Sequence, residues 1–148
     1  MLHITGPQNV VEVPDGDPTD PPYVVIPYVD EMQYGYAAAD FVICRSGAMT
    51  CTELAAVGLP AAYVPLPLRG GEQRRNAEPV VASGGALLVD NADLDPAWIE
   101  STLIPVLTDP ERIAAMSAHA SAAGAPDADV VLARHVLTAV AERRRFAS

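Results

Sequence analysis

One stretch of this chain, Ile43 to Pro67, limits its possible folds more than any other. An apolar run ends at Cys44, a glycine-containing turn follows, and a helix-start pattern leads into the apolar residues Leu54–Val57. Glycine and proline then end the helix, and Ala61–Val64 reads as a second strand. A strand, turn, helix and strand in succession is the unit that builds parallel sheets. The stretch therefore predicts an α/β fold.

The turn in this unit, Ser46-Gly47-Ala48, has a chemical consequence. The first backbone N–H groups of a helix have no acceptor within the helix, and they carry the positive end of its dipole. Phosphates favour this position. Further β and α patterns alternate along the chain with short links, which predicts a Rossmann-like, doubly wound parallel sheet. Ligands of such sheets bind where strands end, here after Ile26, Cys44 and Val64.

The composition narrows the choice of partners. The chain has 148 residues, half of them hydrophobic and 19% charged, enough for one domain with a core. Its formal net charge of −10 argues against nucleic acid as a partner. No cluster of residues has the spacing of metal ligands, so we expect no metal and no cofactor. We expect Cys44 and Cys51 to be small core residues, as in a reducing cytoplasm.

Arginines gather at the end of the chain, at 143–145. Two interpretations stay open. The cluster could contact anionic lipid head groups. It could also be the solvated end of a helix, which we favour because cations stabilise helix C-termini.

Glu53 has two interpretations. Thr50 and Glu53 match a capping box, in which the carboxylate bonds back to the N-cap amide. Alternatively the carboxylate accepts hydrogen bonds from a ribose diol, as acidic residues do in nucleotide-binding sheets. Spacing alone favours the capping box. A hydrolase is disfavoured, because the sequence around Ser46 lacks the first glycine of a nucleophile elbow.

Two amides, Gln73 and Asn76, open a helix after a loop rich in proline and glycine. They either cap that helix or recognise sugar hydroxyls, since an amide both donates and accepts. Near Tyr28, the backbone of Val29 is a candidate contact for a base, although a loop aromatic usually only packs.

Two segments closely resemble one family. ADFVICRSGAMTCTELAAVGLPAAYVPLP and EQRRNAEPVVASGGALLV are similar to the C-terminal half of the MurG family, bacterial N-acetylglucosaminyltransferases that convert lipid I to lipid II. The resemblance runs from about Leu2 to the end of the chain. It implies one half of a GT-B glycosyltransferase, in which two Rossmann-like domains face each other and the C-terminal one holds UDP-N-acetylglucosamine.

The resemblance also implies roles for residues. Glu53 would bind the ribose hydroxyls, Val29 the uracil through its backbone, and Gln73 the sugar hydroxyls. Glu72 stands where the family often has a second Gln. Together with the candidates from the turn after Cys44 and from the helix that begins near Gln73, these residues form the expected donor site. We expect the donor to contact Val29, Ser46, Gly47, Ala48, Met49, Thr50, Glu53, Gln73 and Asn76.

The glycine-rich GGSQGA loop that opens this domain in the family does not occur in the sequence. We therefore expect residues 1–148 to be a C-terminal UDP-sugar-binding domain, incomplete at its N-terminal edge and without the N-terminal acceptor domain. The resemblance implies a cytoplasmic enzyme, peripheral to the inner face of the cell membrane through anionic lipid. Lipid I would contact the N-terminal domain.

We expect no catalytic residue in this chain and no turnover by it alone. The function expected is the donor half of an inverting, metal-independent glycosyltransferase of peptidoglycan synthesis. The alternatives are a non-catalytic nucleotide-sugar-binding module and the donor subunit of a split, two-chain N-acetylglucosaminyltransferase. An epimerase of the UDP-N-acetylglucosamine type shares the fold, but the sequence shows no acid/base cluster for it.

Overall fold

A computed structural model describes residues 1–13, 17, 19–68, 70–125 and 127–146, and the side chains of 144–146 lie outside this description. The chain divides into two compact units, Met1–Ala39 and Asp40–Ser148. Each unit is described by itself.

The first unit holds a two-stranded parallel sheet and one helix. Strands β1 (Leu2–Ile4) and β2 (Val24–Ile26) pair in register from Leu2 opposite Val24, and α1 (Met32–Ala37) follows. The short apolar runs at 2–5 and 23–26 predict the two strands, and the helix-forming residues at 31–39 predict the helix.

The second unit contains the strand–turn–helix–strand stretch and its continuation. Its elements are β3 (Val42–Cys44), α2 (Ala48–Ala56), β4 (Ala61–Tyr63), α3 (Glu72–Ser83) and β5 (Ala86–Leu88). The three strands form a parallel sheet in the order β3-β4-β5. The predicted Rossmann-like α/β class is confirmed, because parallel strands alternate with helices that return the chain.

A helical run follows the sheet. It comprises α4 (Pro96–Trp98), a π-helical turn η1 (Ile99–Leu103), α5 (Ile104–Leu107), α6 (Pro110–Ala123) and α7 (Ala128–Phe146). The side chain of Asp95 caps the first of these helices by accepting from the Trp98 amide, and Asp109 caps α6 by accepting from the Arg112 amide.

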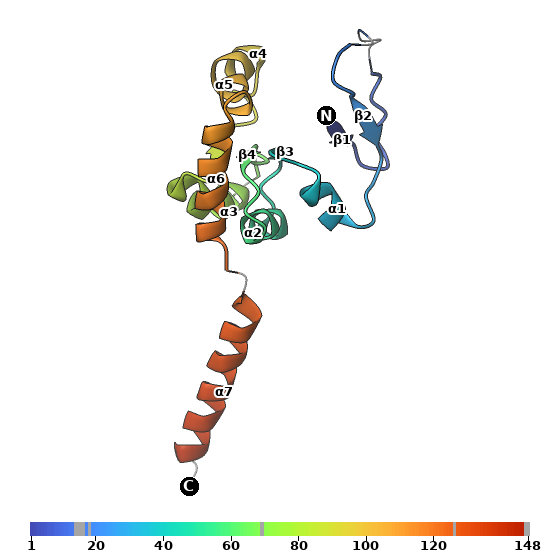
Figure 1. Cartoon of the computed structure of the whole chain (residues 1–148). Helices are drawn as coiled ribbons and strands as arrows, with labels where there is room; N and C mark the ends of the chain where they lie inside the picture. Colours follow the sequence, from blue (N-terminus) through green and yellow to red (C-terminus); the bar gives the residue numbers. More distant parts are fainter. Residues whose placement is uncertain (14–16, 18, 69, 126, 147–148) are drawn as a thin grey trace. The chain divides into compact units, whose positions relative to one another are not determined.

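The core of the second unit lies around β4. All three residues of this strand are buried, and it is the central strand of the sheet, paired with β3 and β5. Helices α2, α3 and α6 contact one another, and Figure 1 shows them gathered near β3 and β4. Helix α2 contributes Cys51, Leu54 and Ala55 to the core. Helix α2 is therefore held in place by core packing.

The uniform apolarity of residues 41–44 predicts a strand that is buried on both faces, and this prediction is wrong. Its only strand neighbour among the described residues is β4, and the side chain of Ile43 is 47% exposed. The uniform apolarity of the run from Phe41 to Cys44 correctly predicted a strand. It could not tell a central strand from the edge of this sheet.

In the described part of the chain, no helix is both long enough and apolar enough to cross a bilayer. The interpretation of the arginine cluster at 143–145 is tested only in part, because the side chains of Arg144 and Arg145 fall outside the described residues. Arg143 is exposed near the C-terminal end of α7, where a cation is stabilised by the helix dipole.

Candidate nucleotide site

Helix α2 begins directly beyond the end of β3, and its first turn has no side-chain cap. The N-cap residue is Gly47, with φ −62° and ψ 150°, so it offers no side-chain acceptor. The first bond within the helix joins the Cys51 amide to the Gly47 carbonyl over 3.0 Å. The three preceding amides, from Ala48 to Thr50, therefore point out of the helix without an intrahelical acceptor.

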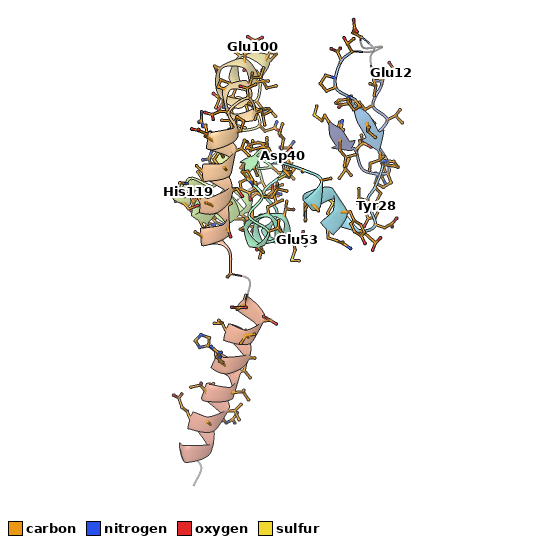
Figure 2. All side chains as sticks on the ribbon, viewed as in Figure 1. Glu12, Tyr28, Asp40, Glu53, Glu100 and His119 are labelled. Carbon is orange, nitrogen blue, oxygen red and sulfur yellow. The ribbon has the colours of Figure 1, made fainter. Side chains whose placement is uncertain are left out.

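The capping-box interpretation of Glu53 is wrong. It requires Thr50 as the N-cap, but the helix begins at Ala48, so Thr50 is already its third residue. Glu53 lies beyond the first turn, which contains no acidic residue. Its side chain is exposed, and Figure 2 labels it on α2. The alternative role, a carboxylate for a ribose diol, is compatible with this location.

The entrance of α2 is open to solvent. Met49 is 71% exposed, and Ala48 is exposed as well. Gly47 and Thr50 are half-buried. An anion could therefore reach the amides of the first turn, which a covering loop would have prevented.

Ser46 is the buried polar residue of this turn. It is 0% exposed, and within the described residues its Oγ atom has no hydrogen-bond partner. An unsatisfied buried hydroxyl costs about 1–3 kcal/mol, so such groups usually have a partner in the functional state. The backbone carbonyl of Ser46 is satisfied, because it accepts a hydrogen bond of 3.1 Å from Nδ2 of Asn76.

The two predicted amides lie on α3 and both bond to backbone. Oε1 of Gln73 accepts from the Leu66 amide at 2.9 Å, which fixes the loop after β4. This bond uses the oxygen of Gln73 and leaves its Nε2 group as a donor for a ligand. Asn76, by contrast, is committed to the turn after β3. The structure thus links the start of α3 to the turn after β3 through Asn76 and to the loop after β4 through Gln73.

Arg45 belongs to the same group of contacts, and the sequence analysis did not include it. Its Nη1 atom donates to the Val64 carbonyl over 3.0 Å, so it joins the carboxyl ends of β3 and β4. A basic side chain placed immediately after an apolar strand was the signal that could have revealed it.

Val29 lies in the first unit, in the segment after β2, and is half-buried beside the 65% exposed Tyr28. Its role in contacting a base stays a prediction.

The two cysteines flank the turn of the site, Cys44 at the end of β3 and Cys51 in α2. Burial, and to a smaller extent the neighbouring Cys51, raise the pKa of the Cys44 thiol to about 12. Burial also raises the pKa of Cys51, partly offset by a hydrogen bond with the Tyr63 hydroxyl. Cys51 is buried in the core, as predicted, whereas Cys44 is only half-buried. No group of three acidic, His or Cys residues in the described ranges could hold a metal ion.

A parallel sheet whose strand ends lead into helix N-termini is typical of Rossmann-like domains. This chain belongs to the glycosyltransferase family 28 C-terminal domain family, whose model matches residues 1–132.

Similar curated proteins carry the name UDP-N-acetylglucosamine–N-acetylmuramyl-(pentapeptide) pyrophosphoryl-undecaprenol N-acetylglucosamine transferase. The protein of Streptomyces avermitilis is 54% identical over 145 residues, which is 98% of this chain and 40% of the relative. That of Mycolicibacterium smegmatis is 54% identical over 148 residues, 100% of this chain and 38% of the relative. The chain therefore spans about two fifths of the length of these relatives.

Two solved structures are similar. The crystal structure of Acinetobacter baumannii MurG superimposes with a TM-score of 0.69 at 29% identity, covering 82% of this chain and 35% of that one. A glycosyltransferase of kitacinnamycin gives a TM-score of 0.62 at 22% identity, with 90% and 34% covered. The second likeness supports the fold alone.

Proposed function

We propose that residues 1–148 form the donor-binding domain of an N-acetylglucosaminyltransferase of peptidoglycan synthesis, which holds UDP-N-acetylglucosamine. The observation that carries the proposal is the uncapped, solvent-open N-terminus of α2 at the end of β3. The names of two relatives that are 54% identical describe N-acetylglucosamine transferases, and this supports the choice of donor.

In this proposal the amides of Ala48, Met49 and Thr50 hold the diphosphate. They are preorganised by the helix and carry its positive dipole, so they stabilise charge without rearranging. Gly47 keeps the backbone accessible, and the buried Ser46 hydroxyl in the same turn has no partner among the described residues.

Two side chains are proposed to bind the ribose and the sugar of the donor. The carboxylate of Glu53 accepts hydrogen bonds from the two ribose hydroxyls. The Nε2 group of Gln73 donates to a hydroxyl of the sugar while its oxygen holds the loop at Leu66. Val29 contacts the uracil through its backbone.

In the transfer step, the acceptor hydroxyl oxygen of lipid I forms a bond to the anomeric carbon. The bond from that carbon to the β-phosphate oxygen breaks, and its electron pair leaves with UDP. The hydroxyl proton goes to a base in another part of the full-length enzyme. This domain contributes positioning and stabilisation of the leaving diphosphate, and we propose that it does not turn over alone.

The full-length enzyme is proposed to act at the inner face of the cell membrane. It would bind anionic lipid there and so reach its lipid acceptor. The exposed Arg143, on the last described helix, is compatible with contact to such a surface.

Calorimetric or NMR titration of this chain with UDP-N-acetylglucosamine and with ADP-ribose tests the donor assignment. We expect the affinity for the UDP-sugar to be at least tenfold higher than the affinity for ADP-ribose. An equal response to both ligands would refute specificity for the uridine donor. Shifts of the Ala48–Thr50 amides upon addition of UDP would locate the diphosphate, and shifts confined to other elements would contradict its assignment to α2.

A further inference from the structure

We propose that the ion pair between Arg74 and Asp90 positions the first turn of α3, so that the Nε2 group of Gln73 meets the sugar of the donor. Arg74 and Asp90 are then positioning residues, because they act on the ligand through Gln73. This inference rests on the proposed function, in which Gln73 binds a hydroxyl of the sugar.

The ion pair joins two elements of the second unit. Nη2 of Arg74, in the first turn of α3, donates to Oδ1 of Asp90, which lies 16 residues further along the chain, just after β5. A cation in the first turn of a helix opposes the helix dipole, so the charge of Arg74 does not by itself stabilise α3. The contribution of Arg74 is therefore its link to Asp90, made by the residue next to Gln73.

Asp90 is a firmly held end of this link. The amide of the preceding residue, Val89, donates to the Tyr63 carbonyl over 3.0 Å, which extends the pairing of β5 with β4. The Asp90 carbonyl accepts from the amides of Asp93 and Leu94 at 2.9 and 3.1 Å, so Asp90 also begins a hydrogen-bonded turn. Its carboxylate therefore projects from backbone that is fixed to the sheet.

The start of α3, by contrast, has few backbone restraints. Gly70 and Gly71 precede it with φ of +102° and +62°, and the N-cap, Gly71, has no side chain that could accept from the first amides. Pro79 lies inside the helix and has no N–H, so the Arg75 carbonyl receives no helical bond from it. Links made by side chains therefore contribute more than usual to the position of this turn.

Two other side-chain links hold α3 near the ion pair. Oε1 of Gln73 accepts from the Leu66 amide at 2.9 Å, and Asn76 donates to the Ser46 carbonyl one turn further on. The bond of Gln73 leads to a loop rich in proline and glycine, whereas the ion pair leads to the sheet. The ion pair thus gives the end of the helix its fixed reference, and so sets where Nε2 of Gln73 lies.

The expected effect is modest, because the ion pair is open to solvent. The side chains of Arg74 and Asp90 are 47% and 54% exposed. Exposed ion pairs contribute little free energy and are screened by salt. We therefore expect a loss of about three- to fivefold in affinity when the pair is broken at low ionic strength.

The test is a set of titrations of Arg74→Gln and Asp90→Asn with UDP-N-acetylglucosamine and with UDP. We expect each variant to bind the UDP-sugar about three- to fivefold more weakly and to bind UDP with unchanged affinity. Arg75→Gln, which replaces the neighbouring exposed arginine of α3, is the matched control and should change neither affinity. An equal loss with UDP would overturn the inference, since it would show a direct contact with the nucleotide or a general effect on the fold.

A double-mutant cycle tests whether Arg74 acts through Gln73. Gln73→Ala removes the sugar contact that the ion pair is proposed to position. In this background, Arg74→Gln should cause no further loss of affinity for the UDP-sugar. A further loss as large as in the unsubstituted protein would contradict the positioning role.

The single Gln73→Ala variant separates failure of the inference from failure of the proposed function. If this variant loses equal affinity for UDP and for the UDP-sugar, the proposed contact of Gln73 with the sugar is refuted, and the inference falls with it. If it loses affinity for the UDP-sugar alone, while both ion-pair variants bind like the unsubstituted protein, only the inference is overturned.

Discussion

A Cβ atom on Gly47 would lie 3.6 Å from Oγ1 of Thr50, an ordinary van der Waals distance. The φ of −62° at Gly47 is one that any residue adopts. Neither backbone conformation nor crowding within the protein therefore requires glycine here. In the proposed site, the absent side chain leaves room for a diphosphate to approach the amides of α2.

Gly47→Ala should weaken UDP binding about tenfold while the free energy of unfolding changes by less than about 0.5 kcal/mol. Alanine lowers the entropy of the unfolded chain but is a poorer N-cap, and these effects oppose each other. Titration with UDP and a denaturant melt measure the two quantities. Undiminished UDP affinity in the folded variant would argue against phosphate at this turn.

Glu53→Ala should weaken UDP-sugar binding by about 1–3 kcal/mol, the scale of a hydrogen bond to a charged group. This loss of affinity should occur only with ligands that carry both ribose hydroxyls. Dideoxy-UDP, which lacks the ribose hydroxyls, should bind the unsubstituted protein and the variant with similar affinity. Glu78→Ala on α3 is the control. A variant that loses equal affinity for UDP and dideoxy-UDP would contradict the ribose assignment.

Gly85→Ala should destabilise the fold by more than about 2 kcal/mol. A Cβ at Gly85 would lie 2.5 Å from the Ala120 nitrogen and 2.6 Å from its Cα atom, both on the backbone of α6. A backbone contact this short forces the helix to move away from the sheet. Chemical denaturation measures the loss, with Gly47→Ala as the tolerated glycine replacement. A variant as stable as that control would contradict the close approach of β5 and α6.

The Cys44 thiol should resist modification in the folded protein. With its pKa raised from 9.0 to about 12, its thiolate fraction at pH 8 is about a thousandfold lower than that of an ordinary thiol. A thiol reagent followed by mass spectrometry should modify Cys44 only after unfolding. Rapid modification of Cys44 in the native protein at pH 8 would contradict the raised pKa of this thiol.

The same pKa shift predicts how stability depends on pH. Above pH 9 the unfolded chain loses the Cys44 proton while the folded chain keeps it, so the unfolded state binds fewer protons. Stability should therefore fall as the pH rises from 9 toward 12, by at most about 1.4 kcal/mol per unit from this group. Comparison of melts with those of Cys44→Ala isolates the contribution, which should be absent from the variant.

The sequence by itself determined the α/β class and predicted a helix start within one turn of the observed start of α2. The apolar run to Cys44, the turn at Ser46–Gly47 and the stop at Gly58 are local signals, and local signals fix where elements begin and end. They also located Gln73 and Asn76 on one helix. Motif resemblance indicated the family to which the chain belongs.

Tertiary structure decided what these residues do. A capping box and a helix that starts one turn earlier share the same spacing of Thr50 and Glu53, and only the backbone shows that Gly47 is the N-cap. Strand order put β3 at the edge of its sheet and exposed Ile43. The roles of Arg45 and Asn76 depend on acceptors 19 and 30 residues away. Such long-range pairings arise only when the chain packs, so local sequence pattern cannot specify them.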